Sequence, residues 1–294
     1  MTILAPTENS AEVAPTQQPL LEVRGLSKSF TSRGAGGKKT TRAVDEISFE
    51  IMPGETFGLV GESGCGKSTT GRCLLRLIEP DSGSVLYEGR DLISMPPREL
   101  HTIRRQIQMV FQDPFSSLNP RRRIGAILEE ALQIQFQLGR KERHARVMSI
   151  LDKVGFSEEY YYRFPHEMSG GQRQRIGVAR ALIVGPKLII CDEPVSALDV
   201  SIQSQILNML HDLQAELGLS YLFISHDLSV VRHISDRIAV MKDGRIVEQG
   251  PTDEIFANPQ HPYTRQLLNA IPASHPSIAR SRHAAASASA APVS

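Results

Sequence analysis

A glycine-rich stretch, residues 61–69, carries the clearest chemistry in this chain. It reads Gly61-Glu62-Ser63-Gly64-Cys65-Gly66-Lys67-Ser68-Thr69. This order fits the pattern G-x-x-x-x-G-K-[ST] of a phosphate-binding loop, with a chance glycine-rich turn as the alternative on the motif alone. Lys67 would reach the terminal phosphates of a nucleotide, and Ser68 would offer its hydroxyl to Mg²⁺. The chemistry that these residues predict is nucleotide binding.

Two carboxylates follow a second apolar run. Asp192 and Glu193 come directly after residues 188–191, which read Leu-Ile-Ile-Cys. In an open α/β sheet, ligands bind at the carboxyl ends of the strands. Asp192 is then placed to hold Mg²⁺ through water opposite Ser68, and Glu193 to accept a proton from the attacking water as general base. Such a pair by itself is often a solvated loop, but the phosphate loop upstream favours the catalytic interpretation.

A histidine and a glutamine also follow apolar runs. His226 comes after residues 221–225, and Gln112 ends a run that begins at Ile107. At the same edge of the sheet, His226 could hydrogen-bond the γ-phosphate or the water, and Gln112 could reach the same metal or water. Considered separately, each of these side chains is more often structural than catalytic.

A second glycine pair precedes another helical run. Ser169-Gly170-Gly171-Gln172 is followed by apolar residues at helical spacing between Ile176 and Leu182. The pattern predicts a second helix N-terminus that can bind an anion. One nucleotide does not need two such sites, whereas two chains arranged head-to-tail would use both.

These side chains need a sheet and helices to position them. The run Thr56–Val60 is apolar enough for a buried strand, and the residues after the loop have near-helical spacing at Leu74, Leu75, Leu77 and Ile78. Residues 187–191 and 220–225 are typical of parallel strands covered on both faces, with a helix of residues 202–217 between them. The remaining expectations are antiparallel half-buried strands around 21–23 and 47–51, a solvated flexible loop at 31–41, and a hairpin of 237–241 with 245–247.

Composition narrows the class of protein. The chain has 294 residues and a formal net charge of +1, which does not indicate nucleic acid as a partner. No apolar run approaches the roughly 20 residues of a membrane-spanning helix. Residues 1–19 lack the pattern of a secretory signal, and three scattered cysteines fit a reducing cytosol.

The ordered set of motifs resembles the ATP-binding cassette (ABC) ATPases over about residues 21–271. The resemblance makes 61–69 the phosphate loop, Gln112 the Q-loop glutamine and 169–172 the signature, with Met168 where leucine is usual. Asp192 and Glu193 would end the Walker B strand, and His226 would be the switch histidine. The remaining nucleotide-binding positions that the resemblance implies are Asp199, the aspartate of the D-loop, and Phe30, the aromatic that stacks on adenine. For Phe30, burial in the hydrophobic core is an equal alternative.

The resemblance implies a fold and a domain organisation. The fold class is α/β, a P-loop NTPase (RecA-like) core with an antiparallel β subdomain and an inserted helical subdomain at about 113–166. We expect a disordered leader at 1–19, the ATPase domain at 20–272 with an importer-type motif at 251–272, and a disordered tail at 273–294.

Residues 111–121 and 261–268 resemble the ATPase subunits of oligopeptide and dipeptide importers, especially the F-type subunit. The resemblance implies ATP and Mg²⁺ as cofactors and a second ABC ATPase subunit, identical or paralogous. It also implies two transmembrane permeases, an indirect extracytoplasmic solute-binding protein, and a peripheral location on the cytoplasmic face of the membrane. Many such subunits continue into a cysteine-rich segment proposed to bind an iron–sulfur cluster. Because no cysteine follows Cys191, we predict no cluster here.

Other functions remain as alternatives. The solute could instead be nickel, glutathione or similar. A soluble ABC ATPase of DNA repair or translation usually carries long coiled coils or tandem cassettes, which this sequence lacks. A GTPase or small-molecule kinase would leave residues 169–172 unexplained, and the Asn-Lys-x-Asp guanine reader is missing.

Overall fold

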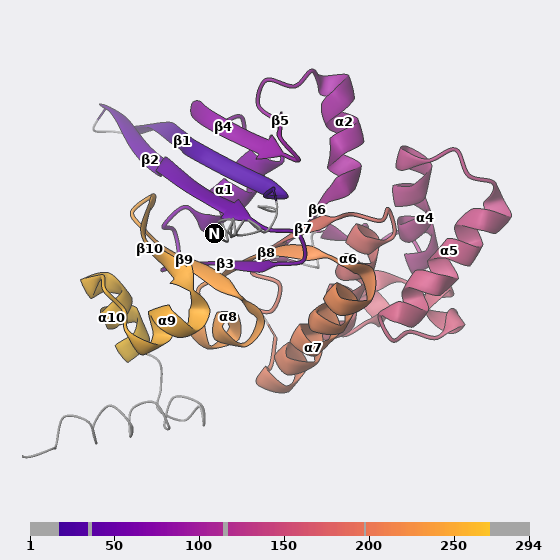
Figure 1. Cartoon of the computed structure of the whole chain (residues 1–294). Coiled ribbons are helices and arrows are strands. Elements are labelled where there is room, and N and C mark those ends of the chain that lie inside the picture. The colour runs from indigo at the N-terminus through magenta and orange to yellow at the C-terminus, as the bar shows by residue number, and fades with distance from the viewer. Residues whose placement is uncertain (1–17, 35–36, 114–116, 197, 271–294) are drawn as a thin grey trace, which may run out of the picture.

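The computed structural model describes residues 18–34, 37–113, 117–196 and 198–270, and it contains two sheets with helices around them (Figure 1). The first sheet is antiparallel and has the order β2-β1-β4-β5, with bounds Gly37–Ile51, Leu21–Gly34, Ser82–Tyr87 and Arg90–Asp91. The second has the order β10-β9-β3-β8-β7-β6, with bounds Arg245–Pro251, Arg237–Lys242, Thr56–Val60, Ser220–Ser225, Leu188–Asp192 and Ile107–Val110. Helix α1 (Lys67–Leu74) lies between the two sheets.

Strands β7 and β8 of the second sheet are buried on both faces, as their sequences predicted. In β7, Leu188 and Ile190 pack into the core shared with α1 and the antiparallel sheet, whereas Ile189 and Cys191 pack into the other core. That other core includes side chains of α6 (Gly170–Leu182), α7 (Val200–Leu217) and α8 (Leu228–Ile234). Strands β9-β3-β8-β7-β6 are parallel to their neighbours, and β10 joins β9 as the expected antiparallel hairpin. Alternate side chains of β7 and β8 pack into two different cores, which explains why these two strands are continuously apolar.

The solvated loop expected at residues 31–41 is wrong. Strands β1 and β2 continue through most of this stretch as one long antiparallel hairpin, with Thr31 opposite Thr40 and Phe30 opposite Thr41. Residues 35 and 36 lie outside the described part of the chain. Paired backbone hydrogen bonds and β-branched threonines favour the extended strands here. Gly34, Gly37, Lys38 and Lys39, whose residue types favoured a loop, therefore lie in the paired strands.

Helix α1 is shorter than the apolar spacing after the phosphate loop suggested. It ends at Leu74, and Arg76 takes a left-handed backbone with φ of 48°. The guanidinium of Arg104 then donates to the carbonyls of Leu75 and Arg76 at 2.9–3.1 Å. These contacts satisfy carbonyl groups at the helix end, so residues 75–78 leave the helix.

Asp45 of β2 links the two sheets through an ion pair and a backbone hydrogen bond. Its carboxylate accepts hydrogen bonds from Arg245 of β10 and from Arg42, each at 2.6 Å. These bonds, with that from Arg245 the stronger influence, hold the pKa of Asp45 below its ordinary value. The backbone N–H of Asp45 also donates to Gly244 at 2.8 Å, so the antiparallel sheet is anchored to the β9–β10 turn.

Helices fill the chain between β6 and β7. They are α4 (Ile124–Gln135), α5 (Arg140–Lys153), the short 3₁₀ turns η1 (Glu158–Tyr162) and η2 (Pro165–Glu167), and then α6. Helices α4 and α5 form the part at the right of Figure 1, and α2 (Pro97–Gln106) precedes β6. After β10 come α9 (Thr252–Ala257) and α10 (Pro262–Asn269).

The termini expected to be disordered lie mostly outside the described residues, as do residues 114–116 of the importer-like stretch. Among the helices that the structure does describe, none combines the length and apolar character needed to cross a bilayer.

Candidate functional site

Four parallel strands end at the candidate site. β3 leads into the phosphate loop, β6 into Gln112, β7 into Asp192 and Glu193, and β8 into His226. Because these strands are parallel neighbours, their carboxyl ends meet at one edge of the sheet, where α/β proteins bind ligands. The sheet topology thus gathers residues that are far apart in the sequence.

Glu193 is the point at which three of the predicted side chains meet. Its Oε2 accepts a hydrogen bond from Gln112 Nε2 at 2.9 Å and lies 3.1 Å from His226 Nδ1. The Glu193 side chain is 9% exposed, whereas that of His226 is 48% exposed. This arrangement holds a carboxylate in place with one oxygen contacted by both neighbours, as an oriented general base requires.

The backbone of Glu193 is held in an uncommon conformation. Its φ is 47°, in the left-handed region that glutamate rarely adopts, and its N–H donates to Ile224 O at 3.0 Å. Such strain persists only where the surrounding structure imposes it. The turn directs Glu193 away from the path of β7 and toward Gln112 and His226.

Lys67 lies inside the phosphate loop. Its Nζ donates to the backbone carbonyls of Gly61 at 2.8 Å and Glu62 at 2.9 Å, and the residue is only 3% exposed. A buried ammonium group needs such partners because desolvation without hydrogen bonds is costly. The loop carbonyls therefore hold Lys67 beside the N-terminus of α1, at the position of a phosphate-binding lysine.

The last glycine of the motif is required by geometry. Gly66 has φ of 111°, and a Cβ at this position would lie 2.0 Å from the carbonyl oxygen of Ala43. Neither the backbone angle nor the space permits a side chain. The close approach of β2 explains why the chain turns into α1 at a glycine.

Ser68 and Asp192 form the candidate magnesium site. Ser68 Oγ donates to Asp192 Oδ1 at 2.6 Å, while the buried Oδ2 has no hydrogen-bond partner in the described part of the chain. Burial raises the pKa of the Asp192 carboxyl above its ordinary value, and the Ser68 hydrogen bond only partly offsets this effect.

A hard divalent cation suits the oxygen atoms of Ser68 and Asp192, because Oδ2 of Asp192 is buried and has no hydrogen-bond partner among the described residues. No group of three or more His, Cys, Asp or Glu side chains that could hold a metal occurs among the described residues. Mg²⁺ fits such a sparse site, because in nucleotide sites it takes one or two carboxylates and completes its coordination with phosphate oxygens and water.

The predicted signature does not meet the phosphate loop within one chain. Ser169 Oγ accepts from Gln172 N at 3.3 Å and Gln172 Oε1 accepts from Ser169 N at 3.0 Å, so the two residues cap α6 reciprocally. Gln172 Nε2 also donates to Tyr160 at 3.0 Å. In the described ranges, no hydrogen bond or ion pair joins residues 169–172 to residues 61–69. The helix N-terminus therefore exists as expected, and it is capped by its own residues.

The other two predicted nucleotide-binding residues, Phe30 and Asp199, are exposed. Phe30 is 44% exposed, with Lys28 Nζ 5.7 Å from its ring centroid, so the core alternative is wrong. Asp199 is exposed and precedes α7, and its carbonyl accepts from Gln203 N at 2.9 Å. Both residues are therefore accessible to a ligand or to a partner.

Sequence reasoning missed contacts on the outer flank of the phosphate loop. The N–H of Glu62 donates to the hydroxyl of Tyr263 at 3.3 Å, and Gly244 N donates to Cys65 O at 3.0 Å. The pattern of residues 261–268 resembles a family motif, but nothing in that pattern indicates where α10 packs. The C-terminal segment thus touches the loop directly.

Comparison with known proteins identifies the family. A family model described as "ABC transporter" matches residues 44–196, which is more than half of the chain. The chain belongs to the ABC transporter family. A second model, "Oligopeptide/dipeptide transporter, C-terminal region", matches residues 247–292. The resemblance inferred from the motifs is confirmed.

Curated relatives match along most of this chain. The oligopeptide transport ATP-binding protein OppF of Bacillus subtilis (strain 168) is 53% identical over 268 residues, covering 90% of this chain and 86% of that protein. The dipeptide transport ATP-binding protein DppF of Escherichia coli (strain K12) is 49% identical, covering 93% and 82%. The glutathione import ATP-binding protein GsiA of the same strain is 52% identical over 90% of this chain, which matches only 43% of that longer protein.

Solved structures of ABC cassettes share the fold. A dimeric, post-hydrolysis state of the cassette MJ0796 bound to ADP and Pi aligns with a TM-score of 0.71 and 28% identity, covering 79% of this chain and 98% of that one. CbiO1 from Clostridium perfringens aligns with a TM-score of 0.72 and 29% identity, covering 86% and 96%. The predicted P-loop α/β fold class is therefore confirmed, and this ABC protein is an ATP hydrolase.

Proposed function

We propose that this ABC ATPase powers an importer of short peptides. The observation that carries the proposal is the second family match, at residues 247–292, because it adds an oligopeptide/dipeptide transporter region to the general cassette. The relatives OppF and DppF, which carry oligopeptide and dipeptide transport in their names, support the same solute class over about nine-tenths of the chain.

The site residues act on ATP in distinct roles in this proposal. The phosphate loop and Lys67 bind the phosphates, and Ser68 and Asp192 hold Mg²⁺, which would neutralise phosphate charge when bound. Glu193 accepts the proton of the attacking water, while Gln112 and His226 keep its carboxylate oriented through contacts of 2.9 and 3.1 Å. Support for these roles comes from the convergence of the side chains at one edge of the sheet.

We further propose that two ATPase subunits form the working unit. In the described residues, the capped N-terminus of α6 and Asp199 form no hydrogen bond or ion pair with the phosphate loop of their own chain, although the family resemblance assigns both to the nucleotide. A head-to-tail pair would place each signature over the partner's nucleotide, and the related cassette MJ0796 is dimeric in its ADP-bound structure. The second subunit is either another copy of this chain or a paralogue.

A groove beside Gln112 suits the contact with a permease. It measures about 260 Å³ and is lined by residues of α2, β6 and α6 and of the segments directly after α1 and β6. Among them are Leu77, Arg104, Gln108, Met109, Phe111 and Arg180. Leu77 is 49% exposed, so one apolar side chain of this lining is open to contact with a partner. We propose that the two permeases dock here, on the cytoplasmic face of the membrane, and that the solute-binding protein acts only through them.

The test of solute class is the growth of a strain that lacks this chain. The strain is compared with the same strain carrying either the wild-type chain or the Glu193→Gln variant. Di- to hexapeptides serve as the sole source of a required amino acid, with glutathione and nickel uptake as parallel arms. We expect wild type, but not the variant, to restore growth on peptides. Normal peptide uptake in the deletion strain, with loss of glutathione or nickel uptake, would contradict the peptide proposal and leave the ATPase assignment in place.

A further inference from the structure

One peptide unit of the phosphate loop is held from both ends. The oxygen of the Gly61–Glu62 peptide accepts from Lys67 Nζ at 2.8 Å, and its N–H donates to Tyr263 Oη at 3.3 Å. Lys67 lies within the loop, whereas Tyr263 reaches the same group from α10. The orientation of this peptide plane therefore depends on the C-terminal helix as well as on the motif itself.

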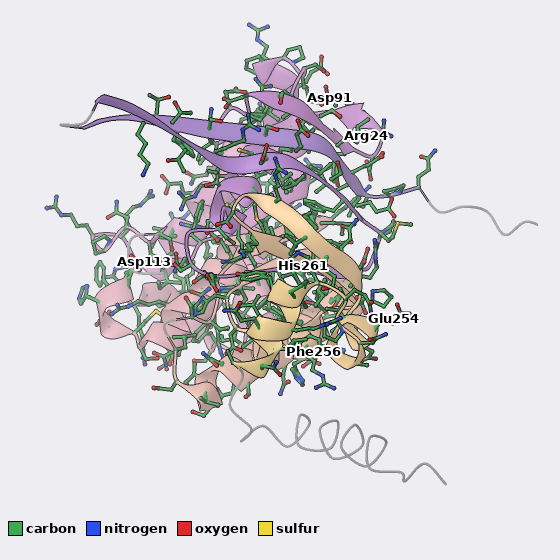
Figure 2. All side chains as sticks on the ribbon, turned by 90° about the vertical axis from the view of Figure 1, so that its left-hand side faces the viewer. Arg24, Asp91, Asp113, Glu254, Phe256 and His261 are labelled. Carbon is green, nitrogen blue, oxygen red and sulfur yellow. The ribbon has the colours of Figure 1, made fainter. Side chains whose placement is uncertain are left out.

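The start of α10 is built to place Tyr263. Its backbone N–H donates to His261 Nδ1 at 3.2 Å, and Pro262 occupies the first helical position, where a missing N–H costs least. The carboxylate of Glu248 on β10 accepts from Gln260 N at 2.7 Å and His261 N at 3.0 Å. Figure 2 shows His261 on the C-terminal ribbon, close to the β9–β10 hairpin. These bonds fix the helix start against the sheet.

Tyr263 is itself buried, and its hydrogen bond with Glu62 is partly buried. The residue is 5% exposed, Lys242 Nζ lies 4.9 Å from its ring centroid, and the neighbouring turn donates from Gly244 N to Cys65 O at 3.0 Å. Burial raises the pKa of the Tyr263 hydroxyl, so it stays protonated and neutral at physiological pH. A neutral hydroxyl can accept the Glu62 N–H without adding a charge next to the phosphates.

We propose that Tyr263 is a positioning residue for ATP binding in this chain. By accepting the Glu62 N–H, its hydroxyl holds the peptide plane whose opposite end anchors Lys67, so the lysine and the loop are ordered for the phosphates before ATP arrives. Without the hydroxyl, the N–H loses its partner and the peptide is free to rotate, which releases one of the two carbonyls on Lys67. The inference rests on the proposed assignment of residues 61–69 as the ATP site.

The deciding variant is Tyr263→Phe, which keeps the buried ring and removes only the hydroxyl. We expect the KM and Kd for ATP to rise about 2- to 10-fold, the range that one net hydrogen bond supports, with kcat changed less than twofold. Amide hydrogen exchange in residues 61–66 should become faster, a readout that does not depend on turnover.

The matched control is Tyr221→Phe. Tyr221 is also a buried tyrosine, but its hydroxyl donates to Leu210 O at 3.0 Å near the amino end of β8, the opposite end from His226. It should lower thermal stability without changing the KM for ATP or exchange in the loop.

The outcomes separate this inference from the site assignment. If Tyr263→Phe matches wild type in KM, Kd and loop exchange while Lys67→Ala loses ATP binding, α10 only packs against the loop and the inference is overturned. If Lys67→Ala itself binds ATP normally, the ATP site is misplaced and the inference falls with it. A higher KM and faster exchange confined to Tyr263→Phe would support the positioning role.

Discussion

Glu193→Gln tests the catalytic site most directly. The structure predicts that the variant keeps its shape, because an amide retains one oxygen acceptor for Gln112 and the backbone bond from residue 193 to Ile224 is unaffected. What it loses is the ability to accept a proton. We therefore expect hydrolysis to fall by roughly 10²–10⁴-fold, the contribution typical of a general base, while ATP binding survives.

The size of this effect can be compared with the structural cost. A loss of 10²–10⁴-fold in rate corresponds to about 2.7–5.4 kcal/mol in the activation barrier. Replacing a charge-assisted hydrogen bond with a neutral one costs much less, about 1 kcal/mol. The free energy of unfolding should therefore change by roughly that smaller amount, so a defect in turnover will not be explained by a defect in folding.

The assay is steady-state phosphate release at saturating Mg²⁺ and ATP, measured beside nucleotide affinity and thermal unfolding. Glu88→Gln is the matched control, because Glu88 shares the left-handed backbone with φ of 48° but pairs with Lys187 at 2.6 Å on the surface. It should leave turnover unchanged. Turnover of Glu193→Gln within threefold of wild type would refute the assignment of Glu193 as the base.

Three further predictions concern assembly, packing and pH. Ser169→Arg should leave ATP bound at the chain's own loop but block hydrolysis at the partner's, and mixing it with Lys67→Ala chains should leave at most one intact composite site per dimer; isolated monomers that hydrolyse ATP at full rate would contradict this. Gly125→Ala should destabilise the helical part by about 1–3 kcal/mol in urea unfolding, because its Cβ would lie 2.4 Å from the Tyr161 ring; an unchanged midpoint would show that the ring moves aside freely. Asp45→Asn should lower the free energy of unfolding by the same amount at every pH from 7 to 5, and its difference from wild type should shrink only below about pH 4. The reason is that the pKa of Asp45 is lowered in the native state, so its carboxylate stabilises the fold above the unfolded pKa. That contribution is lost as the pH falls through the native pKa. A difference that grows on acidification would show that the ion pairs are not its source.

Local patterns in the sequence determined much of this protein. The continuous apolar runs around Ile190 and Phe223 specified strands buried on both faces, and the glycine spacing that ends at Gly66 specified a turn into a helix. The glycine pair Gly170-Gly171, followed by an apolar run at helical spacing, similarly indicated the start of α6. Such features depend on side-chain period and backbone freedom within a few residues, which a single sequence displays.

Tertiary structure decided what those patterns could not. Residues 31–34 and 37–41 form paired strands because each strand supplies the other's hydrogen bonds, a pairing that composition does not display. Gln112 meets Glu193 across 81 residues, and Tyr263 meets Glu62 across 201. Such contacts depend on the order of strands in the sheet and on where α10 packs, and both are set by the burial of whole faces rather than by any local spacing.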